Sequence, residues 1–230
     1  MNRPCGNRGV AWAATILFLI ATLSCSKGYN KYADEYYAQG KILFDNMDYE
    51  RSADSFTKVL ELAPAGEENN RVYYMRGLSY SKSRQYEKAI YDFTRALELT
   101  GSGDNGFRFL VYEMRGDAQF GKQAWQSAID DYWKAVSEDV DNKNAKYVYL
   151  NRGWAYLYSN DAAAAIKDFD RVISIDPGLA EAYYGRGTAW LNRSDPQRAL
   201  AEAKEALRLK PDEKRYDDLV YEISSGSKRK

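Results

Sequence analysis

The chain has 230 residues, with 33 Lys and Arg against 33 Asp and Glu, two cysteines and no histidine. A neutral chain lacks the clustered cations that bind phosphate backbones, so we expect no nucleic-acid partner. The missing histidine excludes Ser-His and Cys-His nucleophiles, while 45% hydrophobic residues suffice for a packed core.

The first 24 residues have the pattern of a secretory signal peptide. Arg3 and Arg8 precede an uncharged run of 14 residues, 10–23. A membrane-spanning helix needs about 20 residues, so this run is too short to cross a bilayer comfortably. We therefore interpret 1–24 as a targeting segment and exclude it from the fold.

Four residues at the end of this segment, Thr22-Leu23-Ser24-Cys25, resemble the lipobox of bacterial lipoproteins, although leucine is usual where Thr22 stands. The resemblance implies a lipid on Cys25 and a short tether over 25–32. The protein would then be a membrane-anchored lipoprotein of the bacterial cell envelope, facing the periplasm or the cell surface. The alternative is ordinary cleavage near Ser24, which would leave Cys25 as a free thiol.

One spacing rule recurs five times along the rest of the chain. Its reference points are the glycines Gly40, Gly77, Gly116, Gly153 and Gly187. Twelve residues after each comes a small residue: Ser52, Ala89, Ala128, Ala165 and Ala199. Sixteen residues after come Phe56, Phe93, Tyr132, Phe169 and Ala203, and four before come Tyr36, Tyr73, Tyr112, Tyr149 and Tyr183. Apolar residues between these points follow a helical period.

This pattern resembles the tetratricopeptide repeat family, whose 34-residue unit is a helix–turn–helix with these residue types at these offsets. The resemblance implies an all-α fold, an α-solenoid of five repeats at 33–66, 70–103, 109–142, 146–179 and 180–213. Glycine should let the two helices of a unit approach closely, facing the small residues and aromatics of the second helix. Residues 101–106 are expected to form a flexible connector between the second and third repeats.

The array needs a cap, because no unit can bury its apolar side alone. Residues 214–223 place Tyr216, Leu219, Val220 and Ile223 on one helical face. We expect a capping helix there, followed by a flexible basic tail over 224–230.

An arginine and an acid vary together among the repeats. Arginine precedes the glycine in repeats two to five, and an acid lies fifteen residues after it: Arg76 with Asp92, Arg115 with Asp131, Arg152 with Asp168 and Arg186 with Glu202. Repeat one has Gln39 and Ser55 instead. We expect an ion pair between the two helices of each later repeat. The alternative is two independent surface preferences.

In this family the first helices line a concave groove that holds partner peptides. Its groove positions fall on Tyr37, Lys41, Phe44, Arg71, Tyr74, Leu78, Lys82, Glu113, Asp117, Phe120, Tyr147, Leu150, Trp154, Tyr158, Glu181, Tyr184, Thr188 and Asn192. Trp154 and Tyr74 are the leading expected contacts, the alternative being that such aromatics pack against the neighbouring repeat. Glu113 and Asp117 make the middle of the groove acidic, which favours a partner carrying lysine or arginine.

Other binding and catalytic motifs are missing. Some relatives clamp an acidic C-terminus with lysine and asparagine, but the residue after the glycine reads Lys41, Leu78, Asp117, Trp154 and Thr188. Residues 139–144 lack the glycine and glutamate of a calcium loop, and no phosphate loop or serine elbow occurs. We therefore predict a non-enzymatic protein-interaction scaffold that binds no metal or cofactor. The alternative is a carrier of lipids or small molecules that uses the aromatic groove.

Overall fold

The computed structural model describes residues 31–64, 68–138 and 144–226. The predicted signal, Cys25, most of the tether and most of the calcium-loop comparison therefore lie outside the described residues. Within them the chain forms eleven α-helices and no strand. The helices are α2 (Lys31–Asp45), α3 (Tyr49–Leu62), α4 (Asn69–Lys82), α5 (Tyr86–Leu99), α6 (Asn105–Gly121), α7 (Trp125–Glu138), α8 (Ala145–Tyr158), α9 (Ala162–Ile175), α10 (Ala180–Asn192), α11 (Pro196–Leu209) and α12 (Lys214–Ser225).

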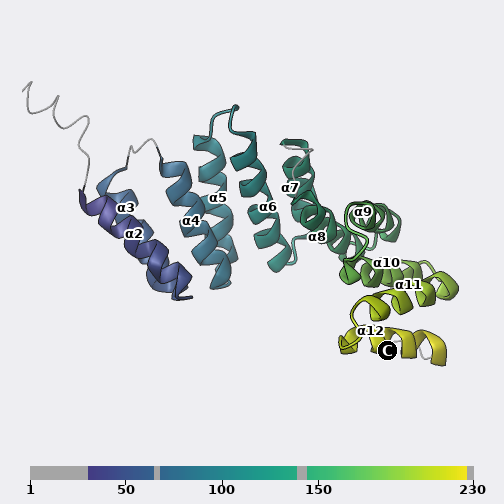
Figure 1. The fold of residues 1–230 in the computed structure, drawn as a ribbon. Helices are drawn as coiled ribbons and strands as arrows, with labels where there is room; N and C mark the ends of the chain where they lie inside the picture. Colours follow the sequence, from purple (N-terminus) through teal and green to yellow (C-terminus); the bar gives the residue numbers. More distant parts are fainter. Residues whose placement is uncertain (1–30, 65–67, 139–143, 227–230) are drawn as a thin grey trace, which may run out of the picture.

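Each helix packs against the next, and the pairs stack in chain order along a bending array (Figure 1). The first helices of neighbouring repeats also touch: α4 contacts α6, α6 contacts α8, and α8 contacts α10. No two second helices in the described chain touch as extensively. Because elements on the inside of a curved stack lie closer together, the first helices line its inner side. The predicted solenoid of five helix–turn–helix repeats with a capping helix is confirmed.

The turn inside every repeat has one geometry. A non-glycine residue with positive φ ends each turn, seven residues after the reference glycine: Met47, Arg84, Gln123, Asn160 and Ser194, with φ between 60° and 67°. The next residue caps the second helix in repeats one, four and five, where Asp48, Asp161 and Asp195 accept a hydrogen bond from the backbone three residues on. Cap and turn together fix where the second helix begins.

The reference glycines lie where the helices of a repeat nearly touch. A Cβ on Gly116 would lie 2.7 Å from Cε1 of Tyr132, and one on Gly77 would lie 2.8 Å from Cε1 of Phe93. In repeats one to four the aromatic sixteen residues later therefore occupies the space that a side chain would need, and in repeat five a Cβ on Gly187 would lie 3.2 Å from the Ala199 carbonyl oxygen. The predicted close approach of the two helices at these glycines is confirmed.

Three predicted boundaries were wrong. Helix α6 begins at Asn105, because Asp104 caps it through the Phe107 backbone N–H and because Phe107 is buried, so the end of the expected connector 101–106 is helical. Helix α2 begins at Lys31, inside the expected tether 25–32. Helix α12 continues to Ser225 and stops at the left-handed Gly226, two residues beyond the predicted 214–223.

Candidate binding groove on the first helices

The eighteen groove candidates all lie on the first helices, and several reach solvent. The exposed candidates are Lys41, Arg71, Lys82, Tyr147, Tyr158 and Asn192. Glu113 is buried, and the other candidates, including Tyr37, Phe44, Leu78, Leu150 and Thr188, are half-buried. The groove therefore carries a row of accessible side chains on a partly closed aromatic floor.

The two leading candidates serve mainly to join repeats. The Tyr74 ring lies between Phe93 of its own repeat and Phe107 of the next, with centroid distances of 5.9 and 5.4 Å. Trp154 likewise contacts Phe169 and Tyr184, at 5.6 and 5.7 Å. Both rings therefore pack against the neighbouring repeat, while they remain partly exposed and their contact with a partner stays a prediction.

A more open aromatic surface lies where repeats three and four meet. Tyr158 is 58% exposed, and its ring stacks on Trp125 with centroids 4.8 Å apart. Phe120 meets both rings edge-on, at 5.7 and 5.0 Å. We call Phe120, Trp125 and Tyr158 the aromatic ledge. Trp125 was not among the predicted residues, although an aromatic nine residues after the glycine recurs at Tyr49 and Tyr86.

Two acids of α6, Glu113 and Asp117, lie one helical turn apart and shortly precede Phe120 of the ledge in the sequence. Asp117 accepts hydrogen bonds from Tyr132 Oη at 2.7 Å and from Asn151 Nδ2 at 3.0 Å. Burial, and then the charge on Asp117, raises the pKa of Glu113 to about 7. Burial, with Glu113 and Asp117 next, also raises the pKa of Tyr74 to about 12. The middle of the groove is therefore negative and poorly solvated. Tyr132 and Asn151, which hold Asp117, were missed because they lie on other helices.

The predicted pairs between arginine and acid are present in all four later repeats. Arg76, Arg115 and Arg152 each bind their aspartate through Nε and Nη2, at 2.7–2.8 Å. Arg186 reaches Glu202 through Nη2 alone, at 2.8 Å. The repeated tyrosine four residues before the glycine lies under the guanidinium, for example Tyr112 under Arg115 at 5.5 Å. Two independent surface preferences do not explain this geometry.

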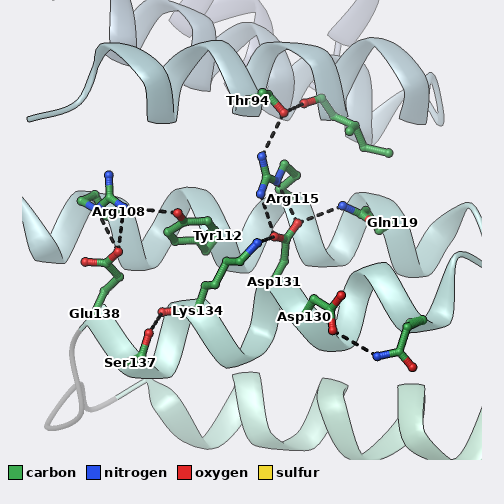
Figure 2. A network of polar contacts seen from close by, with 12 residues as sticks. Thr94, Arg108, Tyr112, Arg115, Gln119, Asp130, Asp131, Lys134, Ser137 and Glu138 are labelled. Atoms are coloured by element: carbon green, nitrogen blue, oxygen red, sulfur yellow. Dashed lines mark hydrogen bonds and ion pairs between the residues drawn. The ribbon is translucent and has the colours of Figure 1, made fainter. Parts of the chain in front are cut away.

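A link to the preceding repeat was missed. The remaining nitrogen of the same arginine reaches the residue seventeen after the preceding glycine (Figure 2 shows Arg115 with Thr94). The partners are Thr57 for Arg76, Thr94 for Arg115 and Asp170 for Arg186, at 2.6–3.0 Å. Arg152 has no such bond from Nη1 and instead lies 4.0 Å from the ring centroid of Trp133. Each arginine thus joins three helices.

Two hollows on the described surface lie away from the groove candidates. One of about 300 Å³ is lined by Thr94, Arg115, Gln119 and Lys134 among others, and one of about 350 Å³ by Arg76, Tyr80 and Tyr91 among others. Neither is lined by a groove candidate. Within the described residues no group of three or more acids or cysteines could hold a metal ion. Nor is any helix in that part of the chain both long and apolar enough to span a bilayer.

Curated relatives match part of this chain. Protein STIP1 homolog of Dictyostelium discoideum is 35% identical over 72 residues, which are 31% of this chain and 13% of that protein. Serine/threonine-protein phosphatase T of Trypanosoma brucei brucei is 32% identical over 96 residues, 42% of this chain and 20% of that protein. The chain thus spans a fifth or less of the length of these two relatives.

Solved structures match more of it. YrrB, described as a TPR protein with an unusual peptide-binding site, has a TM-score of 0.68 at 22% identity, covering 88% of this chain and 97% of that one. The MamA protein also has a TM-score of 0.68 at 22% identity, covering 81% of this chain and 96% of its own. Identities this low support the fold alone.

Family models described as tetratricopeptide repeat match residues 33–65, 71–99 and 150–214. Together they account for more than half of the 230 residues. These matches agree with the five helix pairs, the shared turn and the glycine contacts. The chain belongs to the tetratricopeptide repeat family.

Proposed function

We propose that this protein is a non-enzymatic scaffold that binds partner proteins or peptides in the groove lined by its first helices. The observation that carries the proposal is the set of groove side chains that packing does not bury, above all Tyr158 and Tyr147. Exposed aromatics amid scattered polar groups are the contacts that dominate protein recognition.

A photo-crosslinking amino acid tests the groove directly. Substituting p-benzoylphenylalanine at Tyr158 should capture a partner in cells, which mass spectrometry would identify. The matched control is the same substitution at Tyr91, a tyrosine on the second helix α5 that is 61% exposed against 58% for Tyr158. Equal capture of the same proteins at both sites would count against groove binding.

The carrier function remains the second candidate, because aromatic rings line the groove. Tyr184 packs on Trp154 and on Tyr216, with centroid distances of 5.7 and 5.0 Å, which leaves little room for an apolar ligand between these rings. This packing favours the scaffold. Native mass spectrometry of the purified protein would favour the carrier if a lipid co-purified and crosslinking at Tyr158 captured no protein.

We further propose that a lipid on Cys25 holds the scaffold at a membrane of the bacterial cell envelope, on the periplasmic or surface side. The sequence around Cys25 supports this, and two or more acyl chains anchor a protein stably. Radioactive palmitate should label the wild type and not Cys25→Ser, which should also leave the membrane fraction. Labelling that persists in Cys25→Ser would refute the anchor.

A further inference from the structure

The third repeat departs from the other four at two groove positions. Three residues before the reference glycine, the others have Tyr37, Tyr74, Leu150 and Tyr184, whereas the third has Glu113. One residue after the glycine the others have Lys41, Leu78, Trp154 and Thr188, and the third has Asp117. The two acids are four residues apart on α6 and so lie on one face of the helix.

Glu113 is the exception among the buried acids. Asp92, Asp131 and Asp168 are each held by an arginine through two hydrogen bonds. Glu113 is only 9% exposed as a residue, and no donor or cation in the described part of the chain forms a hydrogen bond or ion pair with it. Its carboxylate oxygens are not among the fully buried polar atoms, so an arriving group can reach them. A buried carboxylate without a counter-charge is costly, and an arriving cation would remove that cost.

The surroundings of Glu113 suit a long cationic side chain. Asp117, held by Tyr132 and Asn151, adds a second negative charge. From α4, Tyr74 faces the acids. The positive charge of Lys82, also on α4, attracts Asp117 electrostatically but forms no ion pair with it. From α7, Tyr132 faces both acids, and α8 contributes the uncharged Asn151. Aromatic rings attract a cation and cover its methylene stem.

We propose that Glu113 and Asp117 form a subsite for the lysine or arginine side chain of a partner polypeptide. This inference rests on the proposed groove function and specifies the chemistry of its partner. The aromatic ledge of Phe120, Trp125 and Tyr158 would take an apolar or aromatic residue of the same segment. A protonated side chain in contact with both carboxylates replaces the arginine that the other buried acids have within the chain.

A phage-displayed random-peptide library gives the test, selected on the whole protein and in parallel on Glu113→Gln. We expect peptides selected on the wild type to be enriched in lysine or arginine beside an aromatic residue. The tightest peptide should bind Glu113→Gln about tenfold or more weakly by calorimetry, since hydrogen bonds to charged groups are the stronger ones. Its norleucine-for-lysine variant should bind both proteins equally.

Two controls separate charge from folding. Asp45→Asn removes an exposed carboxylate from the first helix of repeat one and should leave affinity unchanged. Glu113→Gln is nearly isosteric and should melt no lower than the wild type, whereas Asp117→Asn tests the second acid. Affinity for the wild type should rise from pH 6 to pH 8 as Glu113 ionises, and affinity for Glu113→Gln should not.

The outcomes distinguish this inference from the proposed function. Selected peptides that lack basic enrichment but lose binding in Tyr158→Ala would overturn the acidic subsite and leave groove binding intact. Peptides that bind Glu113→Gln and Tyr158→Ala as tightly as the wild type would overturn both, as would a library that yields no binder.

Discussion

Arg115 and Asp131 are joined by two parallel hydrogen bonds, Nε to Oδ2 at 2.8 Å and Nη2 to Oδ1 at 2.7 Å, across the two helices of the third repeat. Their side chains are 14% and 2% exposed, so the pair is largely shielded from water. Nη1 of the same arginine donates to Thr94 of the second repeat (Figure 2). Arg115 therefore connects the two helices of its own repeat and also links the third repeat to the second.

A double-mutant cycle on Arg115→Met and Asp131→Asn should give strong coupling. Each single change removes the counter-charge of a largely buried group, although Asp131 keeps its hydrogen bond from Gln119 and Arg115 keeps its bond to Thr94. Each should cost about 2–4 kcal/mol of unfolding free energy, while the double mutant should lose clearly less than the sum. Urea denaturation measures all four proteins, with Lys58→Met and Glu61→Gln on the exposed face of α3 as a weakly coupled control. A coupling near zero would mean that the pair has no net role.

Adding one methyl group at two positions of α6 should have opposite effects. Gly116→Ala would place Cβ 2.7 Å from Tyr132 Cε1, so overpacking should destabilise the protein by about 1–3 kcal/mol. Gly106→Ala meets nothing within 4 Å and should stabilise it by up to about 1 kcal/mol, because alanine favours helix. Thermal and urea unfolding measure both. A neutral Gly116→Ala would mean that the two helices can separate without loss.

The positive-φ turn residues offer a second backbone test. Arg84 has φ of 60°, a conformation that costs roughly 1 kcal/mol for a residue with a Cβ. Arg84→Asn, which copies Asn160 of the fourth repeat, should therefore raise stability by several tenths of a kcal/mol. Arg84→Val, with its branched Cβ, should lower stability by more than Arg84→Ala does. If all three variants unfold alike, the turn geometry does not limit stability.

Stability should fall as pH rises through the titration of Glu113. Burial and Asp117 raise its pKa in the folded protein from 4.5 to about 7. Between these values the folded chain keeps a proton that the unfolded chain has lost, so the free energy of unfolding decreases with increasing pH. Glu113→Gln lacks this penalty and should be more stable than the wild type by roughly 1–3 kcal/mol at pH 8, with no such gain at pH 4.

Urea unfolding at a series of pH values measures the effect. Asp45→Asn, at an exposed carboxylate, is the control for the loss of one charge and should show no pH-dependent gain. A wild-type protein as stable as Glu113→Gln at pH 8 would show that Glu113 is already compensated within the fold.

The contacts inside each repeat could be predicted, because the residues that form them are separated by fixed numbers of residues within one repeat. The distance from Gly116 to Tyr132, or from Arg115 to Asp131, depends only on two short helices and one turn that every repeat shares. A residue pattern that recurs in four of the five repeats therefore predicts the same contact in each repeat that carries it. The capping face of α12 followed from the same helical period, and Tyr216 and Leu219 are buried as expected.

The candidate site was less predictable. Tyr74 and Trp154 occupy groove positions, but their rings are used to join neighbouring repeats, which a single repeat cannot reveal. Trp125 entered the groove surface from a second helix, through its stacking on Tyr158. Both outcomes depend on how one repeat is rotated against the next.

The sequence by itself determined the family, the helix pairs, the close glycine contacts and the pairing of arginine with acid, because all of these repeat with the period of the chain. Only the tertiary structure decided which partner from the preceding repeat each arginine binds, and that Trp133 replaces a hydroxyl at Arg152. It also showed that Glu113 is buried and that no cation among the described residues pairs with it. These features arise between repeats, where contacts depend on the angle of stacking and on side chains brought together from three different helices.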